Sequence, residues 1–363
     1  MISEISSVDI NESSNEKDVS IDSSVQNVPN ISVLLPVFKA KLEYLKDAID
    51  SILNQSFECF ELIILYEPFE GDSTLNFLTE FSDDRLKVIK VDEGMGLPRT
   101  LNYGLDISEG KYIARMDSDD YSLPDRFRKQ FDFMEAHPDI DILGGKISYM
   151  DNNSTSFSEN ISQEGRNVRM LFENAGIAHP TALFRRSSFE LNNLRYDETI
   201  KGSEDYRLWA DAIIKGLRIA SLEEVVLKYR RHDNQASVLL ADEMSEWNAE
   251  TRIKLLNWYF GATKRQEDIF LSFGKRGKLK YSCKDYEDLF CRLMEENCKK
   301  RKLDSNLLEM EIEWQWIWFA QYQIRRCRDF TLLKSRFFIG FFRPRCLKYA
   351  FARMRSIMRQ KYN

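Results

Sequence analysis

The sequence lacks the charge balance of a general nucleic-acid binder. Its 52 Lys and Arg residues are outnumbered by 58 Asp and Glu residues, and the formal net charge is -6. Binding to a nucleic-acid backbone depends on Lys and Arg side chains that neutralise phosphates. We therefore expect no nucleic-acid partner. The six cysteines form no CxxC pair, which is typical of free thiols in a reducing compartment.

Long apolar runs are also missing. The longest one near the C-terminus, Phe337 to Phe342, contains Gly340 and is far too short to cross a bilayer. Residues 1–30 lack a basic start followed by an apolar stretch, so we expect no signal peptide. These absences favour a cytoplasmic location.

Three regions of the chain differ in composition. Residues 1–30 are rich in Ser, Asn, Asp and Glu and contain no aromatic residue, which predicts a disordered acidic and polar tail. Residues 31–240 alternate strand and helix signals and form the predicted main domain. Residues 241–363 read as helical and end in a segment rich in Arg, Lys and Phe. A chain of 363 residues is long enough for one large domain and a smaller unit.

The main domain has a repeated strand–helix order. Short apolar runs predict strands at 31–35, 60–65, 86–91 and 111–116. Helical spacing or an N-terminal proline predicts helices that start near residues 42, 98 and 124. This order predicts an α/β fold with a parallel sheet and right-handed crossovers. Ligands of such sheets bind beyond the carboxyl ends of the strands, which here carry Pro36, Glu67, Glu93 and Asp117.

Three carboxylates are clustered at the end of the fourth predicted strand, in the run Asp117-Ser118-Asp119-Asp120. At neutral pH they repel one another unless a cation lies among them. Hard oxygen ligands favour Mg²⁺ or Mn²⁺, which commonly also bind substrate phosphates. The alternative is a solvated acidic loop in which Asp120 caps the next turn.

A series of ordered motifs carries a resemblance to a known family. The motifs are Ile31-Ser-Val-Leu-Leu-Pro-Val-Phe38, Ala48-Ile-Asp-Ser-Ile-Leu-Asn-Gln55, Gly96-Leu-Pro-Arg-Thr-Leu-Asn-Tyr-Gly104, Gly110-Lys-Tyr-Ile-Ala-Arg-Met-Asp-Ser-Asp-Asp120, Leu123-Pro-Asp-Arg-Phe127, His179-Pro-Thr-Ala-Leu-Phe-Arg185, Ser203-Glu-Asp-Tyr-Arg-Leu-Trp209 and Tyr229-Arg-Arg-His232. With them, residues 31–237 resemble the family-two glycosyltransferases, which are inverting enzymes. Within that family, these residues resemble more specifically the enzymes that assemble bacterial capsule, exopolysaccharide or O-antigen.

The resemblance implies a GT-A fold. This is a Rossmann-like nucleotide-binding α/β domain with a mostly parallel sheet flanked by helices, followed here by a helical C-terminal extension. It also implies a nucleotide-sugar donor, with a UDP-sugar favoured. Pro36, Val37 and Phe38 would line the pocket for the base and ribose. The family usually reads the base with an Asp after the second strand, and Glu67 is the candidate substitute here.

The next implied roles concern the diphosphate and the metal ion. Arg99 and Asn102 would contact the diphosphate or ribose, although Arg99 also fits an exposed residue at a helix start. Asp117 would bind ribose or metal, Ser118 would lie against the nucleotide sugar, and Asp119 would bind the metal directly. The implied cofactor is Mn²⁺ or Mg²⁺, which offsets charge on the departing nucleoside diphosphate.

The resemblance assigns roles to two histidines as well. His232 would lie near the metal or the diphosphate, and a neutral imidazole suits Mn²⁺. The alternative for His232 is a hydrogen-bonded loop histidine. His179 precedes a proline, which favours an extended or turn conformation, and would line the donor-sugar or acceptor pocket.

An acidic pair at a helix start supplies the implied general base. Inversion needs an acceptor hydroxyl that attacks opposite the leaving group with the help of one base. In the family this base belongs to a Glu-Asp pair, here Glu204 and Asp205. We assign the base to Asp205 and acceptor positioning to Glu204. The alternative is that both acids only favour the positive end of the helix dipole.

The basic, aromatic C-terminal end predicts attachment to an anionic membrane surface. Its alternative is a helix docked on the acidic main domain or on a protein partner. The predicted protein is therefore a cytoplasmic enzyme, peripheral on the inner face of the cell membrane, with a glycan or lipid-linked glycan acceptor.

Other classes of protein fit less well. A phosphatase with an Asp-x-Asp nucleophile has that motif after its first strand, whereas here it follows the fourth. A nucleotidyltransferase needs a Gly-rich loop after the first strand, which Pro36-Val-Phe-Lys-Ala40 is not. A non-catalytic protein that binds nucleotide sugars, or a scaffold, remains the alternative.

Overall fold

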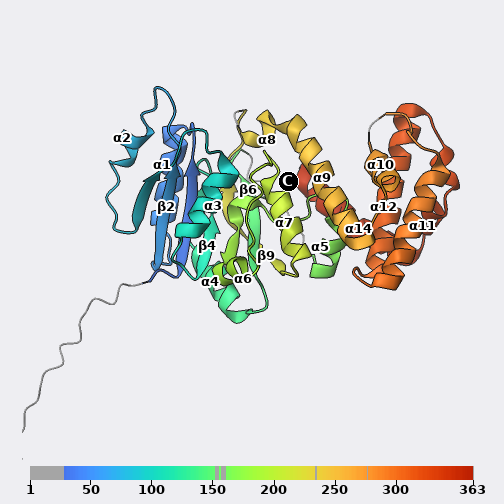
Figure 1. Ribbon diagram of the computed structural model, residues 1–363, viewed down its shortest axis with the longest axis horizontal. Coiled ribbons are helices and arrows are strands. Elements are labelled where there is room, and N and C mark those ends of the chain that lie inside the picture. The colour runs from blue at the N-terminus through green and yellow to red at the C-terminus, as the bar shows by residue number, and fades with distance from the viewer. Residues whose placement is uncertain (1–27, 152–154, 157–160, 234, 276, 363) are drawn as a thin grey trace, which may run out of the picture.

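The computed structural model describes residues 28–151, 155–156, 161–233, 235–275 and 277–362. Most of the predicted disordered tail, residues 1–27, lies outside the described residues. Figure 1 shows an elongated molecule, with the sheet towards one end and a group of helices at the other.

One mixed sheet forms the first part of the molecule. Its strand order is β3-β2-β1-β4-β8-β6-β9-β5, and β7 pairs with β6. Its strands are β1 (Ile31–Val37), β2 (Phe60–Tyr66), β3 (Leu86–Lys90), β4 (Tyr112–Arg115), β5 (Tyr121–Ser122), β6 (Ile142–Tyr149), β7 (Thr155–Ser156), β8 (Leu183–Arg185) and β9 (Ile219–Tyr229). The four predicted strands are confirmed and run parallel as β1 to β4. β8 is antiparallel to both β4 and β6, so the second half of the sheet is mixed.

Pro36 lies inside β1 instead of ending it. It is opposite Leu65 of β2, and the strand continues to Val37. A proline cannot donate a backbone hydrogen bond and is confined to strand positions where none is needed. Here the pairing of β1 with β4 ends at Leu34, which leaves that side of Pro36 without a strand partner.

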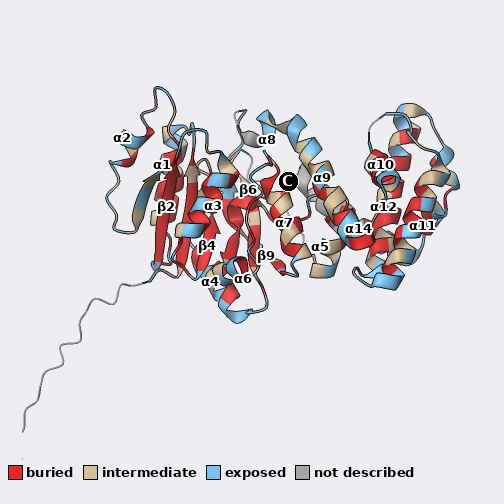
Figure 2. Ribbon diagram, viewed as in Figure 1, coloured by how far each residue is buried: buried red, intermediate tan, exposed pale blue. Residues whose placement is uncertain are grey.

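Helices cover both faces of the sheet. They are α1 (Leu42–Leu53), α2 (Thr74–Leu78), α3 (Leu97–Ile107), α4 (Arg126–Ala136), α5 (Gln163–Arg169), α6 (Arg186–Leu191), α7 (Glu204–Ile214) and α8 (Ala236–Leu239). The side chains of β1 point alternately to the two faces of the sheet, so they contribute to two separate hydrophobic clusters, one on each face. Val33 and Leu35 pack with α1 and α4, whereas Leu34 packs with α3 on the other face. Figure 2 shows this burial concentrated in the strands.

The remainder of the chain is helical, as predicted. It consists of α9 (Ala241–Phe260), α10 (Lys264–Ser272), α11 (Cys283–Lys300), α12 (Ser305–Tyr322), a π turn (Gln323–Cys327), α13 (Arg336–Gly340) and α14 (Pro344–Tyr362). The predicted boundary at residue 240 is not a break in the core. One hydrophobic cluster runs from Leu34 and Trp209 in the sheet part to Phe290, Trp316 and Phe337 in these helices.

Helix α14 returns from the distal helices towards the middle of the molecule (Figure 1). Arg353 is its anchor, with a side chain only 6% exposed. Its guanidinium lies 2.9 Å from Glu173, which follows α5, and 3.5 Å from the fully buried Glu311 of α12. Tyr349 donates a further hydrogen bond to Glu311. Part of the basic C-terminal end is therefore docked on protein.

Removal of the Arg353 charge should destabilise the fold. In Arg353→Met we expect a loss of about 3 kcal/mol in the free energy of unfolding, because a broken buried ion pair leaves an uncompensated charge. Urea denaturation of the full chain measures this. The matched control is Arg345→Met, whose side chain is 44% exposed and binds Glu309, and which should cost no more than about 1 kcal/mol. Equal costs for the two variants would contradict the docked position of Arg353.

Candidate active site

The acidic cluster lies at the carboxyl end of β4, at the edge of the sheet where ligands of α/β folds bind. One carboxylate oxygen from each of Asp117, Asp119 and Asp120 lies within 4.8 Å of the others. Asp117 and Asp119 are partly exposed and Asp120 is buried. Ser118, between the two acids of the predicted motif, is also partly exposed. The strand thus delivers three carboxylates to one point.

Arg115 balances the first of these carboxylates. It precedes Asp117 by two residues, so both side chains leave the strand region on the same side. Its Nη1 donates to Asp117 Oδ2 at 2.5 Å, and a second nitrogen contacts the other oxygen. Burial alone would lower the pKa of Arg115, but the charge and hydrogen bonding of Asp117, with smaller contributions from Tyr196 and Glu204, together raise that pKa above its ordinary value and keep the guanidinium charged. Asp117 is therefore held in a fixed orientation.

Asp119 and Asp120 have different partners. Asp119 Oδ2 lies 2.8 Å from His232 Nε2, and burial together with the charge of Asp117 raises the pKa of Asp119. Asp120 Oδ1 accepts a hydrogen bond from the Arg230 backbone at 2.9 Å. Its buried Oδ2 has no hydrogen-bond partner among the described residues. A buried oxygen without a partner within a carboxylate cluster fits the hard-ligand set of Mg²⁺ or Mn²⁺.

His232 lies beside Asp119, the predicted metal ligand. Its contact with Asp119 corresponds to the hydrogen-bonded alternative. Its other ring nitrogen is buried and has no partner within the described ranges. Coordination of a metal ion by His232 stays a prediction.

The Glu204–Asp205 pair occupies the first turn of α7. Asp205 Oδ1 accepts from the Tyr206 backbone N–H at 2.6 Å, and Oδ2 accepts from the Asn174 amide at 3.2 Å. The first contact is the one expected of an acid at a helix start. Burial raises the pKa of Asp205. Burial and the charge of Asp205 raise the pKa of Glu204 to about 7.

Both acids belong to the same site as the Asp cluster. Arg115 lowers and Asp117 raises the pKa of Glu204 and of Asp205. These charges act on one another only over short distances. The candidate base and the candidate metal ligands are therefore close enough for their charges to act on one another.

His179 lies in the core near Arg115. It is buried, its Nε2 is 2.8 Å from the Tyr196 hydroxyl, and its ring packs edge-on against Trp209. Burial and the charge of Arg115 lower the pKa of His179 well below its usual value. The imidazole is therefore neutral, and contact of His179 with the donor sugar or the acceptor stays a prediction.

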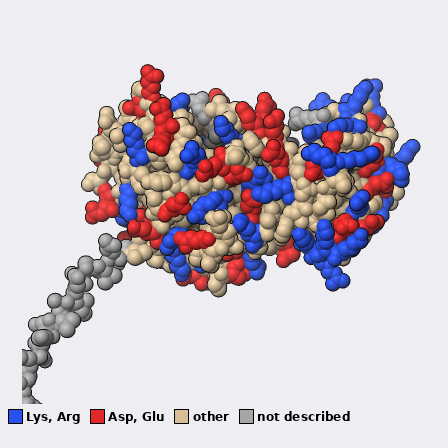
Figure 3. Space-filling model, in the orientation of Figure 1, with Lys and Arg blue, Asp and Glu red and all other residues tan. Residues whose placement is uncertain are grey.

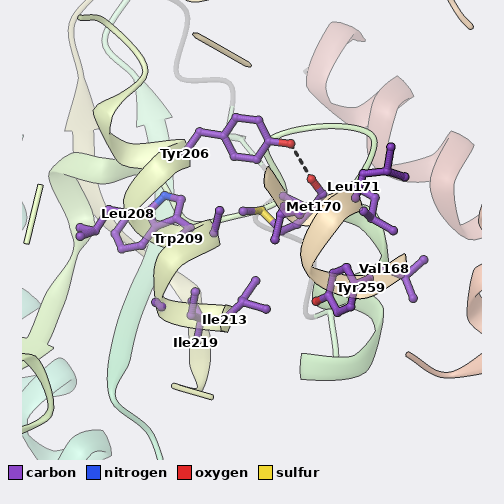
Figure 4. Packing of buried hydrophobic residues seen from close by; sticks show 14 of the residues in the cluster. Val168, Met170, Leu171, Tyr206, Leu208, Trp209, Ile213, Ile219 and Tyr259 are labelled. Atoms are coloured by element: carbon purple, nitrogen blue, oxygen red, sulfur yellow. Dashed lines mark hydrogen bonds between the residues drawn. The ribbon is translucent and has the colours of Figure 1, made fainter. Parts of the chain in front are cut away.

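The packing of α7 explains how its acids are positioned. Tyr206 donates from its hydroxyl to the Met170 carbonyl at 2.5 Å, which Figure 4 shows alongside the apolar contacts of Trp209 and Tyr259. Gly176 lies directly against the Trp209 ring, because a Cβ built there would be 2.0 Å from it. The segment that carries Asn174 can therefore approach α7 closely enough to reach Asp205.

The predicted donor-binding residues Pro36, Val37 and Phe38 lie at the carboxyl end of β1, at the same edge of the sheet. Val37 is buried and Pro36 is partly exposed. Phe38 is 51% exposed and contacts the partly buried Phe69 edge-on, with ring centres 6.2 Å apart. The exposed ring of Phe38 is available there for a nucleobase.

Glu67 has a structural role that its sequence position did not reveal. Its two carboxylate oxygens accept from the backbone N–H groups of Gly94 and Gly96 at 3.0 and 3.1 Å. Both glycines have φ of +74°, a conformation that other residues rarely adopt. Glu67 therefore fixes the loop before α3, and base recognition by it stays a prediction.

Arg99 and Asn102 both contact the segment after α6. The Asn102 amide donates to the Tyr196 carbonyl at 3.0 Å, and its oxygen accepts from the Tyr196 N–H at 2.9 Å. Arg99 is 59% exposed and lies 3.5 Å from Glu198. Asn102 thus holds the backbone of Tyr196 in place. Contact of either residue with a diphosphate stays a prediction.

Sequence reasoning missed several residues of the site. Arg115 could have been found, because residues two apart on a strand share a face. Arg230, which donates to the Asp119 carbonyl at 2.8 Å and to Asp47 at 2.7 Å, gave no such signal. Nor did the buried Arg126, whose Nη2 donates to the Arg115 carbonyl at 2.8 Å. Burial lowers the pKa of Arg126 to about 9.

Solved structures with the same arrangement define the class of fold. The S. aureus TarS 1–349 crystal structure in complex with UDP-GlcNAc has a TM-score of 0.56 with this chain at 17% sequence identity. The match covers 83% of this chain and 92% of TarS 1–349. The fold is therefore of the GT-A type. Within the described residues, no helix is long and apolar enough to cross a membrane.

Sequence comparison identifies the family. The model of glycosyl transferase family 2 matches residues 32–191. The uncharacterized glycosyltransferase MJ1057 of Methanocaldococcus jannaschii is 32% identical over 216 residues, or 58% of this chain and 74% of the relative. The Escherichia coli O-antigen biosynthesis glycosyltransferase WbnJ is 32% identical over 240 residues, or 64% and 92%. The chain belongs to glycosyl transferase family 2.

Proposed function

We propose that this glycosyltransferase is metal-dependent and inverting. It transfers a hexosyl or N-acetylhexosaminyl group from a nucleoside-diphosphate sugar to a hydroxyl of a glycan or lipid-linked glycan in bacterial surface polysaccharide synthesis. The observation that carries the proposal is the closeness of two acidic groups, the cluster Asp117, Asp119 and Asp120 and the pair Glu204 and Asp205, with the charge of Asp117 acting on both acids of the pair. A UDP-sugar is the favoured donor, supported by the UDP-GlcNAc bound to TarS.

The donor side of the site would hold the nucleotide and the leaving group. Phe38, which is exposed, and the partly buried Phe69 offer an aromatic surface for the base. Asp119 and Asp120 would hold Mn²⁺ or Mg²⁺, with Asp117 oriented by Arg115. The bound ion supplies positive charge that stabilises the departing nucleoside diphosphate.

The acceptor side would supply the base. An acceptor hydroxyl attacks the anomeric carbon opposite the leaving group, while Asp205 takes its proton and the bond to the diphosphate oxygen breaks. Asp205 suits this role because its carboxylate is oriented by Asn174 and its pKa is raised by burial. A base with a raised pKa is better matched to neutral pH. Glu204, with a pKa raised to about 7, would help to position the acceptor.

A panel of sugar nucleotides tests this function. We expect release of nucleoside diphosphate from one or a few donors with Mn²⁺ or Mg²⁺, and loss of that release when EDTA is added. The measurement is a coupled assay of the free diphosphate, with slow hydrolysis by water as the baseline. Binding of a donor without any release, with all plausible acceptors present, would instead support a non-catalytic binding or scaffold protein.

The location of the enzyme is part of the proposal. We place it in the cytoplasm, peripheral on the inner face of the cell membrane, where lipid-linked acceptors are found. Figure 3 shows Lys and Arg gathered over the C-terminal helices on the face in view. Exposed apolar side chains lie in the same part of the chain, namely Phe330, Ile339, Phe342 and Phe351. Basic and apolar groups together favour attachment to an anionic surface.

Removal of two exposed apolar side chains should weaken that attachment. We expect the double variant Ile339→Ser/Phe342→Ser to bind anionic vesicles at least about tenfold more weakly, because a buried Ile or Phe contributes about 1.5–3 kcal/mol. Salt should also weaken wild-type binding without abolishing it, since screening acts on charges alone. Vesicle co-sedimentation measures both effects. The control Leu191→Ser, which removes a side chain 86% exposed on the sheet part, should bind as wild type does. Equal binding by the double variant would remove the membrane proposal.

A further inference from the structure

A cavity of about 460 Å³ lies beside the candidate base. Its walls come from three places in the fold: the segment after α5, the first turn of α7 and the N-terminal half of α9. The volume falls in the range of about 300–1,000 Å³ that is usual for small-molecule sites. Figure 1 shows α9 running next to α7, and the cavity is formed where they meet the segment after α5.

Two wall residues place the cavity next to Asp205. Asn174 lines it and donates its amide to Asp205 Oδ2 at 3.2 Å. Tyr206 also lines it, and its backbone N–H donates to Asp205 Oδ1 at 2.6 Å. A molecule in the cavity would therefore be adjacent to the group that takes the acceptor's proton.

Helix α9 presents polar side chains to the cavity. Ser245, Asn248 and Arg252 are three and four residues apart, a spacing that puts them on one face of the helix. In the described part of the chain, none of the three side chains forms a hydrogen bond or ion pair with another side chain. Arg252 makes only a long contact of 3.4 Å to the Asn248 carbonyl. A hydroxyl, an amide and a guanidinium are thus free to donate to a ligand.

Arg252 is the cation on the wall of the cavity. Burial lowers the pKa of Arg252, and no carboxylate of the described residues pairs with it. Glu173 is the acid on the wall, but Arg169 and Arg353 both bind it, so its charge is already balanced. A partly buried cation without a partner is costly unless an anion accompanies it.

We propose that this cavity is an acceptor subsite in which Arg252, with Asn248 and Ser245, binds an oxyanion of the acceptor, either a phosphate or a carboxylate. The inference rests on the proposed function, because it takes Asp205 as the base. Arg is suited to this role, since its planar fork donates two parallel hydrogen bonds to either group. The subsite would prefer an anionic acceptor over a neutral sugar, because a neutral sugar would leave these hydrogen-bond donors without a charged partner.

Saturation-transfer NMR on the full chain tests the subsite directly. The probes are methyl phosphate, methyl glucuronide and methyl glucoside, each observed through its methyl protons, in EDTA so that no metal ion draws anions to the donor side. We expect at least one of the two anions to bind at least tenfold more tightly than the glucoside. In Arg252→Gln that binding should fall about tenfold or more. The anion that depends on Arg252 identifies which oxyanion the subsite prefers.

Lys254→Gln is the matched control, because Lys254 is on the same helix but pairs with Asp211 and does not line the cavity. It should bind the anions as wild type does. Equal anion binding by wild type and Arg252→Gln, or glucoside binding as tight as that of both anions, would overturn the inference.

Donor hydrolysis separates this inference from the proposed function. Release of nucleoside diphosphate with water as acceptor does not use the subsite, so hydrolysis by wild type and by the control Lys254→Gln tests the proposed function without it. Absence of hydrolysis and of transfer in wild type would count against the proposed function alone. Normal hydrolysis in both proteins, with anion binding unchanged in Arg252→Gln, would count against the subsite alone.

Discussion

Glycosyl transfer should fall at least about 100-fold when Asp119 is replaced by alanine. The three carboxylates at the end of β4 bring their oxygens within 4.8 Å of one another, and Asp119 also holds His232 at 2.8 Å. Charge stabilisation of a leaving group by a bound ion is worth several kcal/mol, and each 1.4 kcal/mol corresponds to about a factor of ten. The fold should persist, because Asp119 is partly exposed.

Two measurements accompany this variant. Mn²⁺ binding by calorimetry should weaken together with turnover, while the melting temperature should stay close to that of wild type. The control is Asp84→Ala, an exposed Asp just before β3 and therefore at the opposite edge of the sheet. It removes the same charge and should leave turnover unchanged. Wild-type turnover in Asp119→Ala would contradict the assignment of the metal site.

The placement of this cluster was predictable from the sequence. Apolar runs of strand length, separated by helical spacing, predicted the four parallel strands, and the carboxyl end of the fourth fixed where Asp117 lies. The Glu204–Asp205 pair was likewise predicted at a helix start. Such features depend on residues that are close in the chain. The spacing of apolar residues among them indicates which face of a strand or helix is buried.

The hydrogen-bond partners of the site could not be predicted in the same way. Asn102 bonds to Tyr196, 94 residues away, and Glu67 binds a loop that only the fold brings close. Both residues were predicted to bind the donor, and both have their polar atoms engaged with backbone. The sequence shows that a residue has a carboxylate or an amide, but it does not show which distant backbone group will form a hydrogen bond with it.

The C-terminal region illustrates the same limit at the level of packing. Its charge pattern predicted a membrane-binding end, and its alternative was a docked helix. Arg353 is buried and Tyr349 is partly buried against Glu311, while Ile339 and Phe342 are exposed. One segment therefore has both a docked and an exposed face. Both faces contain basic and aromatic residues, so composition alone does not distinguish the docked face from the exposed one.

Replacement of Asp205 by asparagine should reduce kcat by about two orders of magnitude or more, because general-base assistance is typically worth 10²–10⁴-fold. The amide keeps the shape of the side chain but cannot accept the proton of the acceptor hydroxyl. Donor affinity should persist, since the predicted donor contacts at β1, β4 and α3 and after β2 do not include Asp205. The measurement is kcat and KM for the donor, with the donor Kd determined separately by calorimetry.

The neighbouring acid should respond differently. Burial and the charge of Asp205 raise the pKa of Glu204 to about 7, so Glu204 is protonated below that pH and ionised above it. If the ionised form positions the acceptor, kcat of wild type should rise with pH through about 7. Glu204→Gln should lose that rise and retain a constant, lower kcat, because its amide does not titrate. The readout is kcat measured from well below to well above neutrality.

The two variants together assign the base. Asp205→Asn should be inactive at every pH, whereas Glu204→Gln should keep most of its activity below pH 7, where Glu204 of wild type is already neutral. Arg115 and Asp117 act on both acids and are unchanged in both variants, so differences between the profiles belong to the acids themselves. A loss of about 100-fold or more in Glu204→Gln, together with substantial turnover in Asp205→Asn, would reverse the two roles and make Glu204 the base.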